Sequence, residues 1–325
     1  MTLDRRTFLA AAAATFGSFA GAQPAAFPSK PIRIVVPFGP GGIADLTARA
    51  VGRKLGEQLG QGVIVENRPG AGGAGAGDMV ARAEPDGHTL LLVSNGTAVS
   101  ATLFKNLPFD ARKDFAPVSL LGTFDMALVV PQTSRFKSLA DLLAAAKAQP
   151  GKLNLATVNI GSTQNLAAEL FKSTAGVDLQ VVPFNGTPAL VTALRAGEVD
   201  AAVEILGPVK PQIAAKALRA LAVMGEKRAS GLPDVPTVAD SGGALAHFHV
   251  SSWNALAVPA ETPREVIAKL NRELVTALND TGLRKTLAEI DVDARSSTPE
   301  QLAALLASET RRWADVIARA NIQRQ

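Results

Sequence analysis

The sequence contains no cysteine and no tyrosine, and only three histidines among its 325 residues. Without cysteine the chain can form no disulfide, no thiolate metal site, no catalytic thiol and no lipid-modified cysteine. His247 and His249 share one face of a possible strand, but His88 is distant in the sequence, whereas a metal needs three or four ligands. We therefore expect no metal site.

Catalytic motifs are missing as well. The sequence has no G-x-S-x-G, no H-E-x-x-H and no phosphate-binding P-loop. Isolated carboxylates such as Asp45 and Glu204 could act as acid and base only if they were paired, and a helix cap and a polar rim residue explain them more simply. The sequence thus does not support an enzyme.

Long hydrophobic runs are also absent, and the one short apolar run falls well below the roughly 20 residues that cross a bilayer as a helix. This alanine-rich run follows the twin-arginine pattern Asp4-Arg5-Arg6-Thr7-Phe8-Leu9 and ends at the small residues Ala20-Gly21-Ala22. The order is typical of a twin-arginine signal peptide. We expect residues 1–22 to be cleaved off near Ala22 and the mature protein to be periplasmic.

Neither sign of charge predominates, since 33 lysines and arginines face 29 aspartates and glutamates, for a net charge of +4. The basic residues are scattered beside acidic ones, so nucleic acid is not an expected partner. A hydrophobic content of 47% with 19% charged residues predicts a globular chain. The length favours two α/β domains.

The most informative stretch is an apolar β-branched run, Ile32 to Phe38, followed by the turn Gly39-Pro40-Gly41-Gly42 and a helix that Asp45 opens. The helix has one apolar face at spacings of three and four, formed by Ala48, Val51, Leu55 and Leu59. A helix start carries unpaired N–H groups and a partial positive charge, and glycine lets a ligand approach the backbone. The stretch predicts a binding site for a carboxylate or phosphate.

Two later turns have the same design. Asn159-Ile160-Gly161-Ser162-Thr163 and Phe184-Asn185-Gly186-Thr187-Pro188 each follow a strand and open a helix, and Glu204 lies near the end of another strand. Strands and helices alternate, which predicts a parallel sheet with helices on both faces. Ligands of such sheets bind beyond the carboxyl ends of the strands, so we expect all three turns to face one cleft. Between the first and the second of these turns, the apolar run at 118–121 leads to a strand that we expect at 126–130.

One enzyme class remains as an alternative, an exported Rossmann-type oxidoreductase that uses a nicotinamide. Gly39-x-Gly41-x-x-Ala44 matches the dinucleotide fingerprint, and Glu66 ends the next strand, where a ribose-binding acid would lie. Gly70-x-Gly72-x-x-Gly75 matches the same pattern in another loop, and Pro40 removes an N–H that a pyrophosphate would use. We expect no cofactor.

Several motifs in one order resemble the solute-binding proteins of tripartite tricarboxylate transporters, also called Bug proteins. The resemblance covers nearly the whole mature chain. It rests on Pro28-Ser29-Lys30-Pro31-Ile32, Val36-Pro37-Phe38-Gly39-Pro40-Gly41-Gly42, Val65-Glu66-Asn67-Arg68-Pro69-Gly70-Ala71-Gly72-Gly73, Pro85-Asp86-Gly87, Asp114-Phe115-Ala116-Pro117-Val118, Arg219-Ala220-Leu221-Ala222-Val223 and Leu232-Pro233-Asp234-Val235-Pro236-Thr237-Val238.

The resemblance implies a type II periplasmic binding protein, or Venus flytrap, with two doubly wound α/β lobes joined by two crossing strands. It places lobe 1 at residues 23–125 plus 252–325 and lobe 2 at 126–251. It implies a small carboxylated solute as ligand, a membrane permease of the tripartite tricarboxylate type as partner, and a monomeric protein. The ligand-binding residues that it implies are Phe38, Gly41, Gly42 and Asp45 in lobe 1, and Ser162, Thr163, Asn165, Phe184, Asn185, Gly186, Thr187 and Glu204 in lobe 2.

The sequence departs from the family pattern at several of these positions. Asn165 stands where histidine is common, Phe184-Asn185 where tyrosine and lysine are common, Glu204 where aspartate is common, and His88 where tyrosine is common. Without the lysine and the histidine, lobe 2 lacks positive partners for a second carboxylate. A monocarboxylate, or a solute with a neutral distal group, is therefore an alternative to a dicarboxylate.

Overall fold

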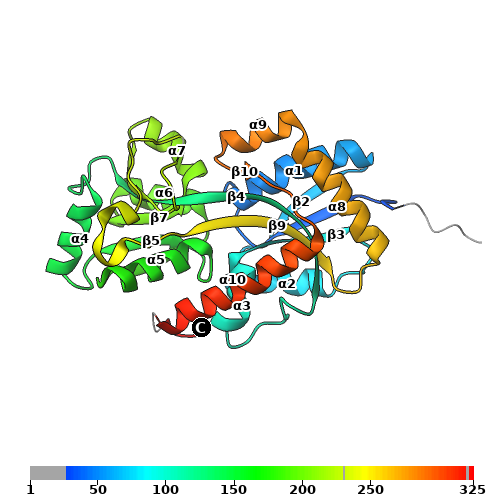
Figure 1. The fold of residues 1–325 in the computed structure, drawn as a ribbon, viewed down its shortest axis with the longest axis horizontal. Coiled ribbons are helices and arrows are strands. Elements are labelled where there is room, and N and C mark those ends of the chain that lie inside the picture. Colours follow the sequence, from blue (N-terminus) through cyan, green and yellow to red (C-terminus); the bar gives the residue numbers. More distant parts are fainter. Residues whose placement is uncertain (1–26, 230, 320–321) are drawn as a thin grey trace, which may run out of the picture.

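A computed structural model describes residues 27–229, 231–319 and 322–325. The chain forms two α/β lobes (Figure 1). Neighbouring strands are hydrogen-bonded in the spatial order β2-β1-β3-β9-β4-β7-β5-β6. This architecture confirms the predicted fold class, whereas the predicted signal peptide lies outside the described residues. None of the helices in these ranges is both long and apolar enough to span a bilayer.

The lobes are joined by a long strand, β4 (Phe115–Pro131), that takes part in both sheets. Up to Asp125 it pairs with β9 (Ser251–Pro259), and from Met126 on it pairs with β7 and β8. The predicted strand at 126–130 is the second half of β4, and the apolar run at 118–121 belongs to its first half. The polar residues between the two apolar runs continue the β4–β9 pairing, so the chain crosses between lobes without a break.

The sheet of lobe 1 is covered on both faces. Ile32, Ile34 and Val36 pack with helices α1 and α8, whereas Val35 and Leu91 pack with α2 and α10 on the other face. This division follows the alternation of side chains along a strand. The elements of lobe 1, besides β4 and β9, are β1 (Ile32–Val36), α1 (Ile43–Leu59), β2 (Val63–Asn67), the 3-10 turn η1 (Ala71–Gly73), α2 (Ala74–Ala81), β3 (Thr89–Ser94), α3 (Asn95–Leu103), α8 (Arg264–Asn279), α9 (Thr281–Glu289), β10 (Asp293–Ala294) and α10 (Pro299–Arg319).

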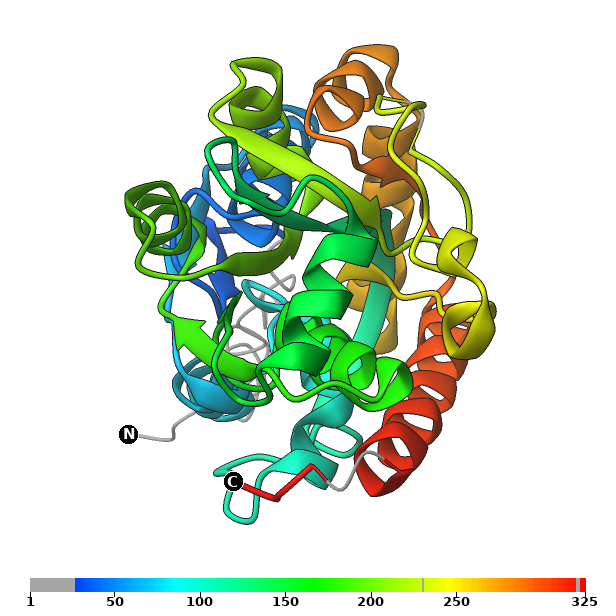
Figure 2. The ribbon, with the colours of Figure 1, turned by 90° about the vertical axis from the view of Figure 1, so that its left-hand side faces the viewer.

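Lobe 2 repeats the plan with a smaller sheet. Leu128, Leu155 and Val203 face α4 and α5, while the alternate residues Val129 and Ala202 face α6 and α7. Figure 2 views the molecule from the side of this lobe, with α10 in red along one edge. The elements of lobe 2 are α4 (Leu139–Ala148), β5 (Asn154–Val158), α5 (Thr163–Ala175), β6 (Gln180–Phe184), α6 (Thr187–Ala196), β7 (Ala201–Ile205), α7 (Leu206–Ala214), β8 (Leu218–Val223), and the 3-10 turns η2 (Ala239–Ser241) and η3 (Gly243–Leu245).

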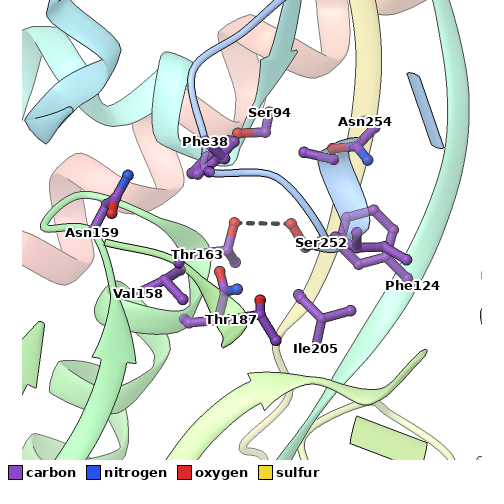
Figure 3. A pocket seen from close by; sticks show the side chains of 16 residues that line it. Phe38, Ser94, Phe124, Val158, Asn159, Thr163, Thr187, Ile205, Ser252 and Asn254 are labelled. Atoms are coloured by element: carbon purple, nitrogen blue, oxygen red, sulfur yellow. Dashed lines mark hydrogen bonds between the residues drawn. The ribbon is translucent and has the colours of Figure 1, made fainter. Parts of the chain in front are cut away.

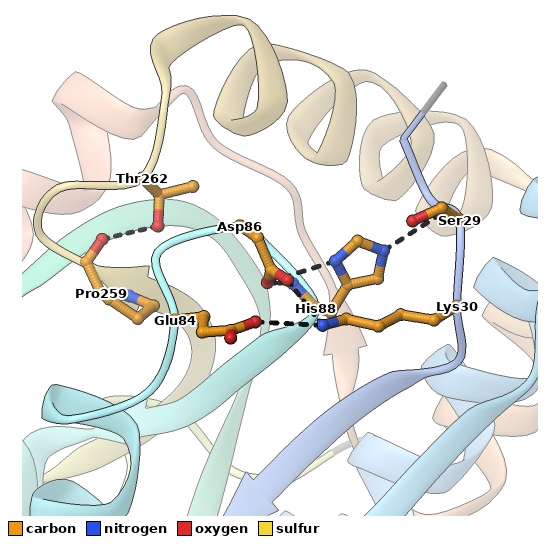
Figure 4. A network of polar contacts seen from close by, with 7 residues as sticks. All are labelled: Ser29, Lys30, Glu84, Asp86, His88, Pro259 and Thr262. Atoms are coloured by element: carbon orange, nitrogen blue, oxygen red, sulfur yellow. Dashed lines mark hydrogen bonds and ion pairs between the residues drawn. The ribbon is translucent and has the colours of Figure 1, made fainter. Parts of the chain in front are cut away.

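The segment that leads into β1 is held by a polar network at the start of β3 (Figure 4). The backbone N–H of Ser29 donates to His88 Nε2 at 3.1 Å, and His88 Nδ1 lies 3.2 Å from Asp86 Oδ1. Lys30 Nζ contacts Asp86 at 2.8 Å and Glu84 at 3.2 Å. His88 is buried, and its Nε2 bond to Ser29, together with the ion pairs of Lys30, fastens the N-terminal segment to the body of lobe 1.

Candidate functional site

A cavity lies between the lobes, where the carboxyl ends of strands from both sheets meet (Figure 3). Open α/β sheets bind their ligands at this edge. The cavity encloses about 460 Å³ of atom-free space, part of which is open to solvent. The lining residues are Phe38, Gly39, Gly42, Ile43, Ala44, Ser94, Phe124, Val158, Asn159, Thr163, Gln164, Gly186, Thr187, Ile205, Ser252 and Asn254.

Four helices begin at this cavity: α1 after Gly42, α3 after Ser94, α5 after Ser162 and α6 after Gly186. The hydroxyls of Ser94 and Ser162 cap their own helices. The starts of α1 and α6 have no side-chain cap, and their caps are the two glycines that line the cavity. Uncapped helix starts leave N–H groups for a ligand, and their partial charge favours an anion.

The turn before α1 is shaped by Gly41 and Asp45. Gly41 has a φ of +79°, a region that favours glycine, and its N–H donates to Asp45 Oδ2 at 2.9 Å. Asp45 Oδ1 accepts a hydrogen bond from Arg49 at 2.9 Å. Burial acts to raise the pKa of Asp45, but the hydrogen bonds from Arg49, Gly41 and Asn67 lower this pKa below its usual value. The carboxylate thus holds the turn and does not line the cavity.

Replacing Asp45 by asparagine is expected to lower the free energy of unfolding at pH 7 by about 1 kcal/mol, because a charge-assisted hydrogen bond is lost. A carboxylate whose pKa is lower in the folded state than in the unfolded state stabilises the folded protein when the pH is above the ordinary pKa of 3.8. This stabilisation is lost as the pH falls through the pKa of the folded state. The difference between Asp45→Asn and the native protein should therefore shrink below about pH 4. Urea unfolding at both pH values measures it, and Asp234→Asn, at an exposed site, should show neither effect.

The two lobes touch each other around the cavity. Thr163 Oγ1 at the start of α5 lies 2.8 Å from Ser252 Oγ on β9, and both hydroxyls are buried (Figure 3). Gly39 lies against the backbone carbonyl of Asn185. These contacts join lobe 1 or its crossing strand to lobe 2 at the edge of the cavity.

Ser252→Ala is expected to weaken solute binding about 3- to 10-fold, because one neutral hydrogen bond between the lobes contributes about 0.5–1.5 kcal/mol. Isothermal titration calorimetry with any bound solute measures the change. Ser241→Ala removes a hydroxyl from a surface turn and serves as the matched control. Equal affinity of Ser252→Ala and the native protein would show that this bond does not stabilise the closed form.

Two buried amide groups at the cavity have no partner. Asn159 Nδ2 and Asn254 Nδ2 make no hydrogen bond with any described residue, although both side chains are at least nine-tenths buried. A buried donor without a partner costs free energy, so these groups are suited to a ligand. Among the described residues that line the cavity, none carries a charge. Backbone and amide donors therefore provide the polarity of the site.

The predicted site residues fall into two groups. Phe38, Gly42, Thr163, Gly186 and Thr187 line the cavity, so the three turns predicted to share one cleft lie together. The others stand behind this lining, where Ser162 caps α5 and Asn165 Oδ1 accepts the N–H of Gly161 at 3.1 Å. Those residues are Gly41, Asp45, Ser162, Asn165, Phe184, Asn185 and Glu204.

Five polar lining residues are not among the predicted ligand-binding residues, although Asn159 belongs to one of the predicted turns: Ser94, Asn159, Gln164, Ser252 and Asn254. Signals were present for some of them. Ser94 and Thr97 form a capping box, which marks a fourth helix start. Ser252 and Asn254 are two residues apart in a strand whose later residues are apolar, so both face one side.

The residues of the alternative interpretations lie elsewhere. Glu66 forms ion pairs with Arg68 at 2.6 Å and Arg33 at 3.5 Å, and it does not line the cavity. His247 and His249 are exposed in a loop that leads to β9, so the possible strand there is not formed. Within the described ranges, no three His, Asp or Glu side chains cluster in a way that could hold a metal ion.

Comparison with known proteins identifies the family. The family model of the tripartite tricarboxylate transporter family receptor matches residues 47–322. The chain belongs to this receptor family. Members are periplasmic solute-binding proteins, which confirms the family resemblance of the sequence motifs.

Individual relatives of the receptor family match over nearly their whole length. The UPF0065 protein in the tcbD-tcbE intergenic region of Pseudomonas sp. strain P51 is 40% identical, covering 97% of this chain and 94% of that protein. Protein BugT of Bordetella pertussis is 36% identical, and the match covers 94% of this chain and 93% of BugT.

Solved structures of the family share the two-lobe fold. A protein of R. palustris with adipate is 30% identical, with a TM-score of 0.87 over 91% of this chain and 99% of that one. MatC from Rhodopseudomonas palustris with bound malate is 33% identical, with a TM-score of 0.84, and the match covers 90% of this chain and 100% of MatC. Both similarities extend over both lobes.

Proposed function

We propose that this receptor captures one small carboxylate between its lobes in the periplasm and delivers it, chemically unchanged, to a membrane permease of the tripartite tricarboxylate type. The observation that carries the proposal is the meeting of two uncapped helix starts, at Gly42 and Gly186, in one interlobe cavity. Such N–H groups bind carboxylates well. Adipate and malate, the ligands of the two related structures, are both dicarboxylates, and they support the broad class of small carboxylates.

The lining suggests how much charge the solute carries. Apolar side chains such as Phe38, Phe124 and Ile205 alternate with amides and hydroxyls, and no described lining residue is cationic. A second carboxylate would lie against neutral groups only, which is unfavourable in a buried site. We propose a solute with one carboxylate held by the N–H groups and a neutral remainder, bound by closure of lobe 2 onto lobe 1.

The same proposal includes the domain boundaries, the export route and the monomeric state. The change of pairing on β4 between Asp125 and Met126 supports the division into residues 23–125 plus 252–325 and 126–251. We propose that a twin-arginine signal cleaved near Ala22 directs the receptor to the periplasm, and that the receptor acts there as a monomer. Mass spectrometry and size-exclusion chromatography of the exported protein test these points.

The experiment that tests the function is a thermal-shift screen of mono-, di- and tricarboxylates, followed by calorimetry of each compound that stabilises the protein. Saturating solute raises the apparent stability of the state that binds it. We expect stabilisation by small carboxylates and none by NAD. Stabilisation by NAD alone would overturn the proposal in favour of the oxidoreductase.

A further inference from the structure

Glu204, at the end of β7, is completely buried directly behind the cavity. Its Oε1 accepts two hydrogen bonds, from the backbone N–H of Ile205 at 2.7 Å and from Gln164 Nε2 at 2.8 Å. Its Oε2 has no partner among the described residues. Ile205 and Gln164 both line the cavity, so Glu204 touches the site only through its neighbours.

This arrangement fixes the orientation of the Gln164 amide. A glutamine amide has one NH₂ group that donates and one oxygen that accepts. One N–H of the Gln164 NH₂ group donates to Glu204 Oε1, which holds the amide with its oxygen, Oε1, turned away from Glu204. No described residue donates a hydrogen bond to that oxygen. Because Gln164 lines the cavity, the oxygen is an acceptor available to a solute.

The acceptor has a different character from the other polar groups of the cavity. Asn159 and Asn254 also have amide oxygens, but no hydrogen bond among the described residues holds either amide in one orientation, and the helix starts offer only N–H donors. The hydroxyls of Ser94, Thr187 and similar residues can rotate to donate or accept. An amide oxygen that cannot turn away accepts only, so it selects for a donor on the solute.

We propose that the receptor selects a hydroxycarboxylate: the carboxylate binds the donors of the cavity, and the hydroxyl donates to Gln164 Oε1, with Glu204 as the positioning residue. This inference rests on the proposed function and adds the group that accompanies the carboxylate. A site built around a hydroxyl leaves its own buried acceptor unpaired when the analogue lacks that hydroxyl. The affinity for a hydroxycarboxylate should therefore exceed the affinity for the analogue without the hydroxyl by more than the loss of a few van der Waals contacts would cause.

The test compares solutes that differ only in the hydroxyl, namely lactate with propionate, 3-hydroxybutyrate with butyrate, and malate with succinate. Calorimetry of the native protein should show at least one pair in which the hydroxylated member binds about 10-fold or more tightly. Gln164→Met should reduce that preference to about 3-fold or less, because the acceptor is gone. Gln149→Met makes the same change at an exposed site of lobe 2 and should retain the preference.

Variants of Glu204 distinguish positioning from mere packing. Glu204→Gln keeps an oxygen that accepts from Gln164 and Ile205, so the preference should survive. Glu204→Met removes this acceptor and frees the Gln164 amide to turn its NH₂ group to the cavity, so the preference should fall. These readouts remain valid if Gln164→Met folds poorly, which its melting curve would show.

The outcomes separate the inference from the function. If carboxylates bind, but the two members of every pair bind with equal affinity, the hydroxyl selectivity is overturned and the proposed function stays intact. A hydroxyl preference that Gln164→Met and Glu204→Met leave unchanged would also overturn it. Failure of every carboxylate to bind would overturn the proposed function itself, and the inference with it.

Discussion

Gly39→Ala is expected to lower the affinity for the bound carboxylate about 10- to 100-fold, because it holds the lobes apart. A Cβ atom at this position would lie 2.7 Å from the backbone oxygen of Asn185 in the opposite lobe. Two backbones meet there, so no flexible side chain can move aside, and overpacking of this kind costs about 1–3 kcal/mol. The φ of Gly39 lies outside the left-handed region, so alanine fits the turn itself.

The substitution should leave the open form folded, which makes the prediction specific to closure. Calorimetry measures the affinity, and small-angle scattering with and without solute measures whether the protein contracts. Gly75→Ala is the matched control, because Gly75 lies in the helix α2 of the same lobe and a Cβ there would meet no atom within 4 Å. Native affinity and native contraction in Gly39→Ala would contradict closure through this contact.

The sequence allowed the helix starts to be predicted because their signals are local. A β-branched run, a glycine turn and an apolar helical face occur within about 30 residues at Ile32 to Leu59, and each follows from short-range geometry. The turns at Gly161 and Gly186 have similar signals. Their meeting in one cavity could be expected from the rule that ligands bind at the carboxyl ends of parallel strands.

The orientation of individual side chains could not be predicted in this way. Asp45 was expected to face the solute, yet Arg49 and the Gly41 N–H turn its carboxylate into the helix start. Ser252 and Asn254 line the cavity only because β9 pairs with β4, about 130 residues earlier in the chain. Long-range pairing and competition among hydrogen-bonding partners decide such positions, and neither is visible in a short stretch of sequence.

The surroundings of Glu204 could not be predicted from the sequence either. The alternating residues of β7 allowed the end of this strand to be located in the sequence. They did not indicate that Gln164 would cover the carboxyl group of Glu204. Burial raises the pKa of Glu204, and the polar groups of Gln164, Ile205 and Thr187 around the carboxyl group lower this pKa by less. The folded-state pKa is therefore above the ordinary value of 4.5, with consequences for stability.

Glu204→Gln is expected to raise the Tm of the protein at pH 8 above that of the native protein, because glutamine has no charge that must be buried on folding. Below the ordinary pKa the glutamate is protonated in both states and resembles glutamine. As the pH rises, the unfolded chain releases this proton first, so the native protein loses stability until the pH passes the folded-state pKa. The advantage of Glu204→Gln should thus grow from about pH 4 to pH 8.

Melting curves of both proteins across this pH range, without solute, measure the difference. Glu198→Gln removes a charge from an exposed site in the same lobe, so its Tm difference from the native protein should stay nearly constant with pH. A difference for Glu204→Gln that is equally flat would mean that the folded protein tolerates the charged carboxylate. In that case a charged Glu204 would also hold the Gln164 NH₂ group, since both protonation states offer an acceptor at Oε1. The pH series therefore tests the burial of the charge separately from the orientation of the amide.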